Sequence, residues 1–134
     1  MQKLENIKYL IIHHTNNNKN VEEIRQQHKA RGFEDIGYHF LIDKKGNLIK
    51  GRNVKFVGAH TLHYNKNSLG IALIGNFNKE KPTRKQIQTL IRFLKEKIKQ
   101  YDLKINSIKG HCNFNKKSCP GKNLNLKKIK QQLR

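Results

Sequence analysis

Apolar residues fall into short runs at several points along the chain, and turn-forming residues separate these runs. The segments 8–14 (KYLIIHH) and 68–75 (SLGIALIG) are compact apolar runs, which is typical of buried strands. Segment 37–52 places two apolar runs on either side of Lys45-Gly46-Asn47 and predicts a β-hairpin. Further short strands are predicted at 56–60 and 107–111.

Three segments between these strands have the pattern of helices. Asn20 is a suitable cap for a helix from Val21 to about Arg31, which Gly32 would end. Thr83 and Gln86 have capping-box spacing, and apolar residues follow at helical spacing, namely Ile87, Leu90, Ile91, Leu94 and Ile98. A last helix is predicted at 124–133. Because strands and helices alternate, we expect a single α/β domain over residues 1–134, with a central mixed sheet flanked by helices.

Charge narrows the choice of partners. The 134 residues include 29 Lys and Arg against 9 Asp and Glu, a formal net charge of +20. This excess implies attraction to a polyanion, such as nucleic acid, an anionic membrane surface or an acidic cell wall, and the alternative is that the lysines only keep the protein soluble. Charge alone does not choose among these. No nucleic-acid motif of recognised form is present, so no specific nucleic-acid partner is expected. No apolar run reaches the ~18 residues of a membrane helix, so we expect no membrane insertion.

Residues able to bind metal lie where predicted strands end. His13-His14 closes the first strand, Tyr38-His39 enters the hairpin, and His111 precedes Cys119 by eight positions. His111 and Cys119 can reach one zinc ion across a loop, and a histidine from another strand would complete a set of three protein ligands. Three ligands and an open position are typical of catalytic zinc. The alternatives are a buried histidine beside a buried thiol, or a disulfide between Cys112 and Cys119.

Four segments together carry a resemblance to a known family: LIIHHT (10–15), IGYHFLID (36–43), GAHTLHYNKNSLGIALIGN (58–76) and GHCNFNKKSCPG (110–121). In this order, over most of the chain, they resemble the type 2 N-acetylmuramoyl-L-alanine amidases, which include phage lysozyme-type amidases and animal peptidoglycan recognition proteins. The resemblance implies a zinc hydrolase, of endolysin or autolysin type, that cleaves the amide between N-acetylmuramic acid and L-alanine of the peptidoglycan stem peptide.

The resemblance also implies roles for individual residues. His13, His111 and Cys119 match the zinc ligands, and Tyr38 and Lys117 match the catalytic residues. His60, Asn65 and Asn67 match a loop that lines the substrate cleft, although turn formation is an equal interpretation for the two asparagines. As donors, Tyr38 and Lys117 suit a developing oxyanion, and both are candidates to protonate the leaving amine.

Two other functions remain open at this stage. One is a peptidoglycan-binding module without catalysis, which the complete ligand set disfavours. The other is a basic regulator that binds a protein or nucleic acid, and a regulatory protein partner is compatible with catalysis. We expect one Zn²⁺ per chain, a monomer, and peptidoglycan as the partner. Residues 1–14 have no signal-peptide pattern, so we expect cytoplasmic synthesis, followed by action on the wall after release or export.

Overall fold

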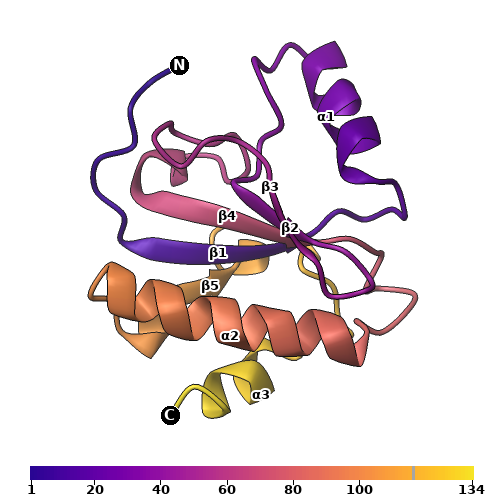
Figure 1. The fold of residues 1–134 in the computed structure, drawn as a ribbon, viewed down its shortest axis with the longest axis vertical. Coiled ribbons are helices and arrows are strands. Elements are labelled where there is room, and N and C mark those ends of the chain that lie inside the picture. Colours follow the sequence, from indigo (N-terminus) through magenta and orange to yellow (C-terminus); the bar gives the residue numbers. More distant parts are fainter. Residues whose placement is uncertain (116) are drawn as a thin grey trace.

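The computed structural model describes residues 1–115 and 117–134, and within them five strands form one sheet (Figure 1). The strands are β1 (Tyr9–His14), β2 (Phe40–Ile42), β3 (Leu48–Lys50), β4 (Ser68–Leu73) and β5 (Ile108–Gly110). Their order across the sheet is β3-β2-β4-β1-β5. The pairs β2–β4, β4–β1 and β1–β5 are parallel, and the hairpin partner β3 is antiparallel. The expected mixed sheet is confirmed.

Helices cover both faces of the sheet. Helix α1 (Val21–Ala30) lies on one side, and α2 (Arg84–Gln100) and α3 (Leu126–Gln131) lie on the other (Figure 1). Asn20 and Thr83 both form the capping boxes that satisfy the first free N–H groups of α1 and α2. Cap spacing and helical periodicity therefore located both helices in the sequence.

Alternation along the strands separates two apolar clusters. Leu10 and Ile12 of β1 face α2 and pack into the larger cluster, with Leu90 and Leu94 of that helix. Ala72 of β4 belongs to the smaller cluster on the α1 side. His13 pairs with Ala72 across the parallel strands, so its side chain emerges on the same α1 side. The sheet thereby directs one strand-end histidine away from the main core.

The predicted strand at 56–60 is wrong. In this segment Phe56 makes only an isolated bridge to Lys3, and the rest is turn and loop. The apolar run is too short, and Gly58 within it lies directly against the His39 and His60 rings, so this segment serves as packing for those side chains. In the described residues no helix is long and apolar enough to span a bilayer.

Candidate metal centre

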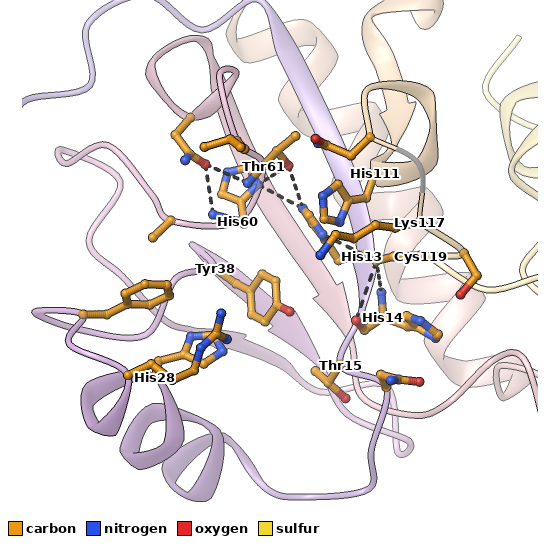
Figure 2. Close-up of a pocket in the computed structure, with 18 residues that line it drawn as sticks. His13, His14, Thr15, His28, Tyr38, His60, Thr61, His111, Lys117 and Cys119 are labelled. Atoms are coloured by element: carbon orange, nitrogen blue, oxygen red, sulfur yellow. Dashed lines mark hydrogen bonds between the residues drawn. The ribbon is translucent and has the colours of Figure 1, made fainter.

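Three candidate ligands meet at the carboxyl edge of the sheet. His13 lies near the end of β1, and His111 directly follows β5, which is the parallel neighbour of β1. Adjacent parallel strands bring the residues at their carboxyl ends to one edge. Cys119 comes from the loop beyond His111 (Figure 2). One ligand atom from each of the three residues lies within 4.8 Å of the other two.

The donor set fits a zinc ion. Zn–N bonds of about 2.0–2.1 Å and a Zn–S bond of about 2.3 Å, at a tetrahedral angle, separate nitrogen from sulfur by about 3.6 Å. His13 Nδ1 and Cys119 Sγ are 3.6 Å apart. Two imidazoles and one thiol are ligands that zinc accepts, and three protein ligands leave one tetrahedral position for a water or substrate oxygen.

Backbone hydrogen bonds hold the Cys119 loop against the sheet. The N–H of His14 donates to Cys119 Sγ at 3.3 Å, and the N–H of Cys112 donates to the Cys119 carbonyl at 2.9 Å. The His14 ring faces the opposite side, where its Nδ1 accepts the Phe77 N–H. Both cysteines are free thiols, so the alternative of a Cys112–Cys119 disulfide is wrong for this structure.

Electrostatics keep both histidines neutral. Burial lowers the pKa of His13 well below its usual value, and the neighbouring His60, His111 and His14 lower it further. Burial and the Lys117 charge lower the pKa of His111. Burial raises the pKa of Cys119 to about 12, although the His14 N–H and Lys117 act in the opposite direction. A metal that binds here therefore has to displace the thiol proton.

A cleft of about 700 Å³ lies over the three ligands. Tyr38 and Lys117 both line it, and Figure 2 shows the Lys117 amine extending into it. The Tyr38 ring lies 5.2 Å from the His13 ring and 5.5 Å from the His28 ring, centre to centre. Burial, and then the nearby Cys119, raise the pKa of Tyr38, so its hydroxyl remains a hydrogen-bond donor.

The three residues expected to bind substrate occupy different positions. His60 lines the cleft and contacts His13, with 2.9 Å between His60 Nδ1 and His13 Nε2. Asn65 also lines it, but its side-chain oxygen accepts the backbone N–H groups of His60 and Thr61, which is the turn-forming role. Asn67 is not among the described residues that line the cleft. Substrate binding by these residues stays a prediction.

Sequence reasoning missed several cleft residues. Thr61 Oγ1 lies 2.9 Å from His60 Nδ1 and 3.3 Å from His13 Nε2. Arg31 and Phe33 line the same cleft beyond the end of α1, with the guanidinium over the Phe33 ring. A Thr beside a candidate histidine was a usable signal, whereas nothing in the sequence distinguishes Arg31 from the other surface cations.

The chain is similar in sequence and in overall structure to known amidases and peptidoglycan-recognition proteins. The profile of the family described as N-acetylmuramoyl-L-alanine amidase matches residues 3–122. The solved structure of the amidase LysC from Clostridium intestinale superposes with a TM-score of 0.91 at 36% identity, and covers 96% of this chain and 85% of that one. The endolysin of Escherichia phage T7 is 35% identical over 108 residues, which is 77% of this chain and 70% of that protein.

An animal recognition protein is equally similar. Peptidoglycan-recognition protein LE of Drosophila melanogaster is 36% identical over 129 residues, which is 88% of this chain but 37% of that protein's length. Its solved structure, in complex with tracheal cytotoxin (a monomeric diaminopimelic acid-type peptidoglycan), has a TM-score of 0.82 at 30% identity and covers 98% of this chain and 87% of that one.

Proposed function

Because the chain belongs to the N-acetylmuramoyl-L-alanine amidase family, we propose that it is a zinc-dependent hydrolase of the muramoyl–L-alanine amide in peptidoglycan. The observation that carries the proposal is the set of His13, His111 and Cys119 at the floor of an open cleft. A set of three ligands leaves a coordination position for chemistry, whereas a structural zinc site normally closes all four.

The reaction adds water to the lactyl carbonyl carbon and breaks its bond to nitrogen, which leaves a lactyl carboxylate and a free L-alanine amine. A zinc ion held by the three residues supplies Lewis-acid chemistry, because it polarises the carbonyl and makes water nucleophilic near neutral pH. The remaining steps fall to side chains of the cleft.

Tyr38 and Lys117 are placed to act on the reacting groups. Tyr38 keeps its hydroxyl proton because burial raises its pKa, so it can donate a hydrogen bond to the oxyanion that develops on the carbonyl oxygen. The Lys117 charge reaches the centre, since it lowers the pKa of both His111 and Cys119. One of these two groups passes a proton to the leaving amine.

The stem peptide is proposed to lie along the cleft. Peptidoglycan-recognition protein LE binds a monomeric peptidoglycan in its solved structure, which supports a similar ligand for this chain. Asn65, Arg31 and Phe33 line the cleft beside the metal ligands and offer polar and apolar contacts to a peptide. The described residues of one chain supply the three candidate ligands, so we propose that a monomer acts on the wall.

Recognition without catalysis is the competing function, because the family relatives include peptidoglycan-recognition proteins. The retained ligand set disfavours it. A surface that only binds peptide gains nothing from holding a buried histidine within reach of a half-buried thiol and a half-buried second histidine, since burial of polar groups costs free energy.

Product analysis tests the proposal. Purified peptidoglycan is incubated with zinc-loaded protein, with chelator-treated protein, and with the Cys119→Ala variant, and the soluble products are identified by mass spectrometry. We expect free stem peptides that begin with L-alanine from the zinc-loaded protein alone. Unchanged peptidoglycan with one zinc bound would overturn the amidase proposal and favour recognition.

A further inference from the structure

We propose that His60 is a positioning residue that fixes His13 in its metal-binding tautomer through a directed chain of hydrogen bonds. The inference deepens the proposed function and rests on it for the identity of the metal. It gives His60 a role on the far side of His13 from the metal, in addition to any contact with substrate.

The two ring nitrogens of His13 face different partners. Nδ1 lies 3.6 Å from Cys119 Sγ, which is the separation that a shared zinc ion requires. Nε2 lies 2.9 Å from His60 Nδ1 and 3.3 Å from Thr61 Oγ1 (Figure 2). A neutral imidazole carries one N–H, so a proton on Nε2 leaves the Nδ1 lone pair free for a metal.

Ser68 sets the direction of the chain. Its hydroxyl donates its only proton to the Tyr64 carbonyl at 2.8 Å, and a carbonyl can only accept. Ser68 Oγ is therefore an acceptor toward His60 Nε2, which lies 3.4 Å away. With its proton on Nε2, neutral His60 has a bare Nδ1, and this nitrogen accepts the His13 Nε2–H.

The backbone holds the His60 ring in a narrow slot. A Cβ at Gly70 would lie 2.5 Å from His60 Cδ2, and a Cβ at Gly58 would lie 2.7 Å from the same atom. Ser68, Gly70 and Ala72 are spaced two residues apart along β4, so all three lie on the same face of the strand. Ala72 pairs with His13 of β1. The strand register thus aligns the acceptor, the slot and the ligand on one face of the sheet.

A neutral partner has a particular consequence for the metal. Histidine ligands commonly donate their second N–H to a carboxylate or a carbonyl. Unlike a carboxylate, a neutral His60 fulfils this orienting task without adding negative charge, so the centre keeps the net charge of about +1 that two neutral imidazoles, one thiolate and Zn²⁺ give. A more positive centre is the better electrophile for a carbonyl.

The wild-type protein provides the first test, without any variant. In the metal-free protein, two-bond ¹H–¹⁵N NMR spectra of the histidine rings report which nitrogen carries the proton. We expect His13 in the Nε2–H form. A dominant Nδ1–H form would overturn the proposal.

Variants provide the second test, by zinc affinity in competition with a chromogenic chelator. His60→Phe keeps a ring in the slot but removes the nearer acceptor and leaves Thr61 Oγ1 at 3.3 Å from His13 Nε2. We expect zinc binding to weaken by about 10–100-fold. His60→Gln restores an acceptor oxygen and should recover part of the loss. His63→Asn is the matched control, because His63 is an exposed histidine of the same loop, and Asn tolerates its positive φ.

Wild-type zinc affinity in folded His60→Phe protein would contradict the proposal, as would an equal loss in His63→Asn. Both readouts use Zn²⁺ and protein without peptidoglycan. An absent amidase activity with the expected tautomer and affinities would therefore refute the proposed function alone.

Discussion

The affinity for zinc should rise with pH, and the number of protons that the ligands release on binding sets the slope. The two histidine ligands have pKa values below the usual range, because burial disfavours their charged forms, so they bind zinc without losing protons near neutrality. Burial raises the pKa of the Cys119 thiol to about 12, so this group is protonated in the metal-free protein. Zinc binding therefore releases one proton.

The magnitude follows from that count. With one proton released, the zinc association constant rises about tenfold for each pH unit, or about 1.4 kcal/mol. Affinity falls as the solution is acidified, because protons compete for the thiolate. Chelator competition at pH 7.0, 7.5 and 8.0 measures the slope, and calorimetry in buffers of different ionisation enthalpy counts the proton directly.

The Cys119→Asp variant is the matched control. A carboxylate starts from an ordinary pKa of about 3.9, so even with the burial that raises the pKa of Cys119 it becomes ionised at the upper end of this range, and the slope should fall below that of the wild type and toward zero as the pH rises. A slope near two in the wild type would mean that a histidine also loses a proton. A slope near zero would mean that the thiolate already exists in the metal-free protein, and either result would refute the reasoning.

Other expected outcomes concern rate, stability and salt. Tyr38→Phe and Lys117→Ala should keep zinc and fold but lose about 10²–10³ in turnover on peptidoglycan, whereas Lys122→Ala, outside the cleft, should not. Gln86→Ala should lower the free energy of unfolding by roughly 2–4 kcal/mol in urea titrations, because the fully buried amide donates to the Ile42 and Ile74 carbonyls; exposed Gln100→Ala is its control. Binding to the cell wall should weaken between low salt and 0.15 M salt, where the Debye length shortens to about 8 Å, because the net charge of +20 is then screened. The amount of protein that sediments with purified wall measures this binding, and an amount that does not change with salt would contradict the prediction.

Local signals in the sequence were sufficient for most of the fold. The side chains of Asn20 and Thr83 accept the backbone N–H group three residues further on, at the first turn of each helix. This short spacing can be read directly from the sequence. The strand-end position of His13 followed from a compact apolar run. The strand prediction for 56–60 was wrong because this segment forms a loop that packs on the His39 and His60 rings. The His60 ring also packs against Gly70 of β4, and a local pattern in 56–60 does not show that contact.

The candidate site was predictable as a set of residue types and less so as an arrangement. The family resemblance identified His13, His111 and Cys119, and the structure brings their ligand atoms within reach of one metal. The bond between His60 and His13 joins residues 47 positions apart, and no local pattern encodes it. Asn65 suited either substrate or turn, and only the three-dimensional structure shows its bonds to the backbone of its own loop.

The most direct test of the central claim is a zinc titration of the metal-free protein in the presence of peptidoglycan, with newly formed L-alanine amino termini counted at each addition. The account predicts that hydrolysis rises linearly and stops rising at one zinc per chain, and that Cys119→Ala shows no hydrolysis at that ratio. Hydrolysis by the metal-free protein, or none from protein with one zinc bound, would contradict it.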